Sequence, residues 1–139
     1  MKYLILIDDH KMLRKGICAF FTENSDWHIL AEAESLEEIP AILSKVKEEA
    51  SNAEDVVVAV VDIQLKESSD SGLLNGFHAV KLLRGHDIPS VIFSSHDTGA
   101  CIERAMSKEI GAKGFVSKLS DEKMLLDAVN TVASGKTYV

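Results

Sequence analysis

The sequence predicts an α/β protein: a doubly wound, five-stranded parallel sheet with helices on both faces. Residues 56–61 read VVVAVV, an apolar, β-branched run typical of a strand buried on both faces. Short apolar runs of this kind alternate with amphipathic segments along all 139 residues. That length fits a single domain with a sizeable core, spanning residues 1–139.

Five strands and five helices are expected in alternation. The strands are predicted at residues 4–7, 27–33, 56–61, 90–93 and 114–116. The helices are predicted at residues 11–22, over an apolar stripe at 39–46, at 75–84, from Asp97 or Thr98 to Gly111, and from Ser120 to Gly135. Because proline is tolerated only in the first helical turn, Pro40 implies that the second helix either kinks or begins late.

Composition narrows the function classes. The net charge is −7 and no block of Lys or Arg is present, which argues against direct binding of nucleic acid or an anionic membrane. The apolar runs are strand-sized, and the N-terminal run is too short for a signal peptide. We therefore expect no membrane span and a cytoplasmic location. Cys18 and Cys101 lack metal-ligand spacing and are interpreted as reduced, partly buried thiols in helices.

Polar side chains follow four of the predicted strands. Because parallel strands end at one edge of the sheet, these side chains are expected to converge there. They are Asp8 and Asp9 after the first strand, Asp62 after the third, Ser94 and Ser95 after the fourth, and Lys118 after the fifth.

This combination suits phosphoryl transfer. Three crowded carboxylates repel one another unless a cation lies among them, and oxygen ligands with open positions suit Mg²⁺. Lys118 supplies a positive charge, and a serine hydroxyl a hydrogen bond, for phosphoryl oxygens. Asp62, on the central strand, is the best-placed nucleophile for an aspartyl phosphate.

Over essentially its whole length the chain resembles the receiver domain of two-component response regulators. Residues 8–17, DDHKMLRKGI, are similar to the Asp-Asp-His…Arg-x-Gly opening of the NarL/FixJ (LuxR-like) subclass. The resemblance implies a flavodoxin-like strand order of 2-1-3-4-5.

The resemblance also implies a role for each site residue. Asp62 would be the phosphoacceptor, and Lys118 the lysine that holds the phosphoryl group. Ser94, favoured over Ser95, matches the switch Ser/Thr, and Phe115 stands at the switch aromatic. The implied Mg²⁺ ligands are Asp8, Asp9, Asp62 and the backbone carbonyl of Gln64.

A receiver domain implies signalling rather than enzyme activity beyond slow self-dephosphorylation. The expected phosphodonor is a sensor histidine kinase or a phosphotransfer domain, and phosphorylation-dependent homodimers are the usual readout. The expected output is transcription, through a DNA-binding domain outside this chain.

Two alternatives remain open: a stand-alone receiver acting as an interaction module, and a small phosphohydrolase of the haloacid dehalogenase type. The phosphohydrolase needs a second Asp two residues after its nucleophile, where Gln64 stands here.

Three features depart from the family pattern. Gly76 follows Asp62 by fourteen residues, a longer interval than usual. Lys66 stands where a proline is common, and Leu119 follows Lys118 where many receivers have proline. The extra loop at residues 66–72 could cover the site, contact a partner or simply be solvated. Four histidines lack metal-ligand spacing and are interpreted as surface or helix residues: His10, His28, His78 and His86.

Overall fold

The computed structural model describes residues 1–63, 65 and 75–139. All four strand pairings of its sheet are parallel, in the order β2-β1-β3-β4-β5. The strands are β1 (Lys2–Ile7), β2 (Trp27–Ala33), β3 (Val56–Val61), β4 (Ser90–Ser94) and β5 (Gly114–Ser117). The predicted fold class and strand order are confirmed.

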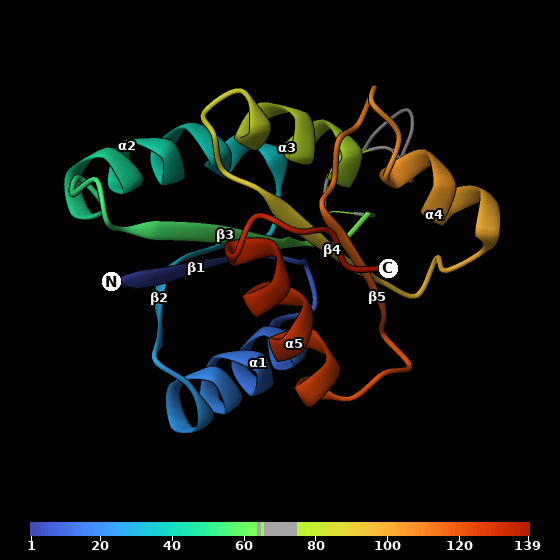
Figure 1. The fold of residues 1–139 in the computed structure, drawn as a ribbon, viewed down its shortest axis with the longest axis horizontal. Coiled ribbons are helices and arrows are strands. Elements are labelled where there is room, and N and C mark those ends of the chain that lie inside the picture. The colour runs from blue at the N-terminus through green and yellow to red at the C-terminus, as the bar shows by residue number, and fades with distance from the viewer. Residues whose placement is uncertain (64, 66–74) are drawn as a thin grey trace.

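The helices cover both faces of this sheet (Figure 1). Helices α1 (Lys11–Asn24) and α5 (Glu122–Ala133) lie on one face. Helices α2 (Ile39–Glu49), α3 (Asn75–Arg84) and α4 (Gly99–Ala105) lie on the other. Each central strand is therefore shielded from water on both sides, which is why β1 and β3 have no polar face.

Alternate side chains of the central strands pack in two separate apolar cores, one on each face of the sheet. Ile5 and Ile7 of β1 pack in the core beneath α2, α3 and α4, whereas Leu4 and Leu6 pack in the core beneath α1 and α5. All four side chains are almost completely buried. The side-chain period of two along a strand produces this division. The two cores fix the sheet between its helix layers, so the strand ends form a rigid edge.

Helix α2 begins late, as Pro40 requires. A 3₁₀ turn, Leu36–Glu38, precedes the helix, and Pro40 lies in the first turn, where its missing N–H costs nothing. The Ser35 backbone N–H donates to Glu38 Oε2 at 3.1 Å, as the Ser-x-x-Glu capping pattern predicts.

Two predicted helix boundaries were wrong. The N-cap of α5 is Asp121, whose Oδ1 accepts from the Met124 backbone N–H at 2.9 Å. The predicted cap, Ser120, belongs to the preceding turn because its N–H donates to the Ser117 carbonyl. Helix α4 ends at Ala105 rather than near Gly111, since the chain turns back there and the Ala112 N–H donates to the Ala105 carbonyl.

The predicted cap of α4 and the predicted setting of the two cysteines agree with the structure. Thr98 rather than Asp97 caps α4, accepting from the Cys101 N–H at 3.3 Å. Cys18 and Cys101 are both free thiols of intermediate exposure on helices. Among the described residues, no helix has the length and apolar character needed to cross a membrane.

Candidate functional site

The site lies where β1 and β3 end side by side. Ile7 and Val61, the last residues of these strands, are register partners. The Asp62 N–H donates to the Ile7 carbonyl at 2.9 Å, and the Asp8 N–H donates to the Ala33 carbonyl at 3.0 Å. These bonds extend the sheet by one residue at each strand end. They place the carboxylates of Asp8 and Asp62 together, at 5% and 4% residue exposure.

Lys118 joins these two carboxylates from the end of β5. Its Nζ lies 2.9 Å from Asp62 Oδ2 and 3.0 Å from Asp8 Oδ2. Burial disfavours the ammonium, but the hydrogen bond to Asp62 and the charges of Asp8 and Asp62 outweigh it and raise the pKa of Lys118. Lys118 therefore stays positively charged at neutral pH, between two buried negative charges.

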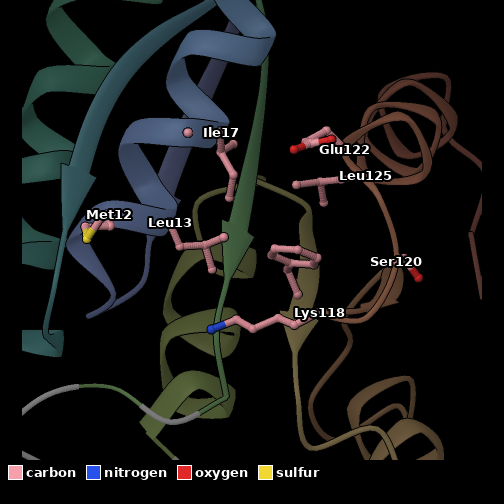
Figure 2. Close-up of a pocket in the computed structure, with 9 residues that line it drawn as sticks. Met12, Leu13, Ile17, Lys118, Ser120, Glu122 and Leu125 are labelled. Atoms are coloured by element: carbon pink, nitrogen blue, oxygen red, sulfur yellow. The ribbon is translucent and has the colours of Figure 1, made fainter.

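The lysine is held in place by its backbone and its stem. The Lys118 N–H donates to the Ser94 carbonyl at 3.0 Å. The side chain also lines a pocket of about 260 Å³ between α1 and α5. Figure 2 shows Lys118 extending across this pocket, with its nitrogen turned away from Leu125. The other residues that line this pocket are Met12, Leu13, Gly16, Ile17, Phe93, Ser120, Glu122 and Leu125. The amine thus reaches the acidic edge while the methylene stem borders a pocket lined largely by apolar side chains.

His10 belongs to the site, and the prediction of a plain surface or helix residue missed this. Its Nδ1 lies 2.9 Å from Asp8 Oδ1, 3.4 Å from Asp9 Oδ1 and 3.8 Å from Asp62 Oδ2. The Lys118 Nζ lies 3.1 Å from the same nitrogen. The signal in the sequence was its position directly after the Asp8-Asp9 pair, at a strand end.

The acidic residues fit a small divalent cation. Asp8, Asp9, His10 and Asp62 each offer one ligand atom, and these four atoms lie within 4.8 Å of one another. Asp9 Oδ1 is shielded from solvent and has no hydrogen-bond partner among the described residues, which fits an oxygen able to bind a cation. The predicted ligand Gln64 and the loop at 66–72 lie outside the described residues.

Arg14 holds the backbone of the site through a hydrogen bond to Asp8, a role that the sequence pattern did not assign. The guanidinium is buried, and its Nη1 donates to the backbone carbonyl of Asp8. Its Nε pairs with Glu32 Oε1 at 3.1 Å, and its Nη2 with Glu34 Oε1 at 3.4 Å. Arg14 therefore ties the turn that carries Asp8 and Asp9 to the loop end of β2.

The two predicted switch residues lie on the neighbouring strands β4 and β5. Ser94 is fully buried at the end of β4, and its Oγ accepts from the His96 N–H at 3.1 Å, whereas Ser95 is exposed. Phe115 is buried in β5, within the core beneath α2, α3 and α4. The described structure thus brings Asp8, Asp9, Asp62 and Lys118 into one cluster. Ser94 adjoins the cluster through the Lys118 backbone.

Comparison with known proteins agrees with this architecture. Residues 4–130 match the family model of the response regulator receiver domain. The transcriptional regulatory protein UhpA of Salmonella typhimurium is 32% identical over 134 residues, which are 96% of this chain and 60% of UhpA. The transcriptional activator protein ExaE of Pseudomonas putida is 28% identical over 98% of this chain and 57% of ExaE. The chain therefore spans less than two thirds of either relative.

Solved structures of response regulators are also similar to this chain. A two-component response regulator of the LuxR family from Aurantimonas sp. SI85-9A1 superposes with a TM-score of 0.77 and 26% identity, covering 99% of this chain and 88% of that one. The response regulator ChrA of a heme-sensing two-component system superposes with a TM-score of 0.70 and 28% identity, over 99% of this chain and 59% of ChrA.

Proposed function

The chain belongs to the response regulator receiver domain family, and from this premise we propose that it is a phosphorylation switch whose phosphoacceptor is Asp62. The observation that carries the proposal is the ion pair of Lys118 Nζ with both Asp62 and Asp8. A lysine held between two buried carboxylates is positioned to pair with additional negative charge at Asp62. Transfer of a phosphoryl group adds that charge.

In the proposed reaction a carboxylate oxygen of Asp62 attacks the phosphorus of a phosphohistidine. The new P–O bond forms as the P–N bond breaks, and the donor imidazole leaves with the bonding pair and takes up a proton. Lys118 pairs with the phosphoryl oxygens and needs no proton transfer, because it is already an ammonium. Asp8, Asp9, Asp62 and the carbonyl of Gln64 are the proposed ligands of Mg²⁺, which when bound would neutralise charge on the phosphoryl group.

The proposed switch runs along the ends of β4 and β5. Ser94 Oγ would donate to the phosphoryl group, giving up the hydrogen bond that it now accepts from His96. Its carbonyl already holds the Lys118 backbone, so movement of either residue is transmitted to the other. Phe115 is the proposed aromatic switch and would change its side-chain position after Ser94. The face formed by α4, β5 and α5 is the surface whose conformation would then shift.

Partners and output follow from the same proposal. The phosphodonor would be a sensor histidine kinase or a phosphotransfer domain in the cytoplasm, and phosphorylation would promote a homodimer. UhpA and ExaE are transcriptional regulators by name. We propose transcription as the output here, through a DNA-binding domain outside residues 1–139, with self-dephosphorylation as the only turnover.

Labelling with radioactive acetyl phosphate and Mg²⁺ tests the proposal. The unmodified chain should incorporate label that hydroxylamine removes, as expected for an acyl phosphate, and Asp62→Asn should incorporate none. Asp26→Asn is the matched control, because Asp26 is exposed and pairs only with Lys2 among the described residues. Undiminished labelling of Asp62→Asn would exclude this phosphoacceptor. Rapid multiple turnover of a phosphomonoester would instead indicate the phosphohydrolase.

A further inference from the structure

The Nδ1 atom of His10 has neighbours that no single proton arrangement can satisfy. It lies 2.9 Å from Asp8 Oδ1 and 3.1 Å from Lys118 Nζ. A carboxylate only accepts hydrogen bonds and an ammonium only donates them. A proton on Nδ1 satisfies Asp8 but faces the lysine donor, whereas a lone pair there satisfies Lys118 but faces the Asp8 oxygen. One mismatched contact remains in either case.

A cation shared with the carboxylates removes the clash with Asp8, because the Nδ1 lone pair and the Asp8 oxygen then both face positive charge. Lys118 does not depend on the imidazole as an acceptor, since its Nζ also contacts Asp8 Oδ2 and Asp62 Oδ2. Asp8 does not need the imidazole as a donor, since the His10 backbone N–H already donates to Asp8 Oδ1 at 2.8 Å. Most of the His10 side chain is exposed, at 63%. The ring is therefore placed at the site by its position after Asp9 rather than by burial in the core.

The distances from His10 Nδ1 to the carboxylate oxygens are compatible with those between ligands of one metal ion. Its separations from the oxygens of Asp8, Asp9 and Asp62 are 2.9, 3.4 and 3.8 Å. Around an octahedral ion with bonds of about 2.1 Å, neighbouring ligand atoms lie about 3.0 Å apart and opposite ones about 4.2 Å apart. All three separations are shorter than the spacing of opposite ligands, so the atoms are close enough for one ion to contact Nδ1 and the carboxylates together.

We infer that His10 supplies a nitrogen ligand through Nδ1 to the divalent ion, so that the site accepts first-row transition metals such as Mn²⁺ and Co²⁺ in preference to Mg²⁺. Imidazole strengthens binding of transition metals much more than of Mg²⁺, whose ligands are oxygens. The inference rests on the cation site of the proposed function and assigns one further ligand to it.

Pulsed electron paramagnetic resonance of the Mn²⁺-loaded chain tests the ligand directly. A nitrogen bound to the ion gives ¹⁴N modulation, which we expect in the unmodified chain and in His86→Ala, where an exposed histidine after α3 is removed. His10→Ala and His10→Gln should lose it. In parallel titration calorimetry, Co²⁺ affinity should fall at least about tenfold in His10→Ala, while Mg²⁺ affinity changes much less. Neither variant touches the apolar core, so both should fold.

Each other outcome has a distinct meaning. Unchanged ¹⁴N modulation in His10→Ala would overturn the inference, as would a Co²⁺ affinity equal to that of the unmodified chain. Tighter Mg²⁺ binding by His10→Ala would also overturn it, by showing that the imidazole competes with the ion. If neither Mg²⁺ nor Co²⁺ binds the unmodified chain and Asp62 is not labelled, the proposed function itself fails.

Discussion

At the scale of single residues, Lys118 determines whether the buried carboxylates are tolerated. Asp8 and Asp62 are both almost fully buried, and the Lys118 ammonium contacts one oxygen of each. A buried charge that loses its partner pays the full cost of desolvation. The site is therefore built around this lysine even before any phosphoryl group arrives.

Replacing the lysine should destabilise the fold as well as impair labelling. In Lys118→Met an unbranched stem is kept, but Asp8 and Asp62 lose their ammonium. The free energy of unfolding in metal-free buffer should fall by about 1–3 kcal/mol. Urea unfolding measures this, with Lys123→Met on the exposed side of α5 as the control. Equal stabilities of the two variants would show that solvent, not Lys118, compensates the carboxylates.

The thiol of Cys18 should be unreactive until strongly alkaline pH. Burial and the neighbouring Glu32 carboxylate raise the pKa of Cys18 to about 11. The thiolate is the nucleophile, so alkylation of the folded chain should accelerate with a midpoint near that value. In the unfolded chain the midpoint should lie at about 8.5. The folded state thus favours the protonated thiol of Cys18, which stabilises the fold. This stabilisation is fully present below the pKa that Cys18 has in the unfolded chain, and it is lost as pH rises through the pKa that Cys18 has in the folded chain.

Iodoacetamide kinetics between pH 8 and 11 check this prediction. A Cys101→Ser background leaves Cys18 as the sole thiol, and the same chain in concentrated urea provides the unfolded reference. Equal rates in folded and unfolded chains near pH 8.5 would show that neither burial nor Glu32 protects the thiol.

At the scale of elements, sequence reasoning succeeded where a periodic apolar pattern decides the structure. The ranges predicted for β2 and α3, 27–33 and 75–84, are those of the structure. It failed at the start of α5, where Ser120 and Asp121 are adjacent residues of similar capping propensity. Two hydrogen bonds distinguish them, from the Ser120 N–H to Ser117 and from the Met124 N–H to Asp121 Oδ1, and both depend on the path of the turn.

In the site, too, sequence reasoning predicted some residues and missed others. Residues directly after strands could be predicted, because the parallel register brings strand ends together. The place of His10 depended on the path of the loop after β1, and that of Arg14 on the position of β2 across the sheet edge. The position of His10 after Asp8 and Asp9 was a sequence signal, but the directions of both side chains are tertiary properties.

Two glycines in helices should respond to alanine in opposite directions. A Cβ on Gly76, in the first turn of α3, would lie 1.9 Å from the backbone oxygen of Asp62. The Gly76 N–H also donates to the Ile63 carbonyl at 2.6 Å, so α3 packs directly on the chain beside Asp62, the proposed phosphoacceptor. Gly76→Ala should therefore lower the free energy of unfolding by about 3 kcal/mol and reduce labelling of Asp62.

Gly16 is the matched control. It lies inside α1, and a Cβ there meets nothing within 4 Å. Gly16→Ala should raise the free energy of unfolding by about 0.5–1 kcal/mol, because glycine loses more backbone entropy on entering a helix. Chemical denaturation measures both variants. Tolerance of alanine at Gly76 would mean that the contact between α3 and Asp62 is looser than the structure has it.

At the scale of the whole molecule, the net charge of −7 gives any cation two ways to bind. It can screen the acidic surface diffusely, or it can occupy the cluster of Asp8, Asp9 and Asp62. Diffuse screening depends on ionic strength, whereas occupation of a folded site stabilises the fold according to ligand concentration and affinity. The two effects separate when Mg²⁺ is varied at constant ionic strength.

Mg²⁺ at ten times its dissociation constant should add about 1.4 kcal/mol to the free energy of unfolding. For a domain of this size that raises the melting temperature by about 5 °C, which thermal unfolding in EDTA and in Mg²⁺ measures. Asp9→Asn should melt no lower than the unmodified chain in EDTA, because the carboxylate oxygen Oδ1 that it affects has no hydrogen-bond partner in the described part of the chain. The variant should nevertheless lose the Mg²⁺-dependent rise. Asp26→Asn, which removes an exposed carboxylate, should keep that rise. An equal rise in Asp9→Asn would show that the ion stabilises the fold by screening its charge, since the molecule then gains the same stability without a complete set of ligands.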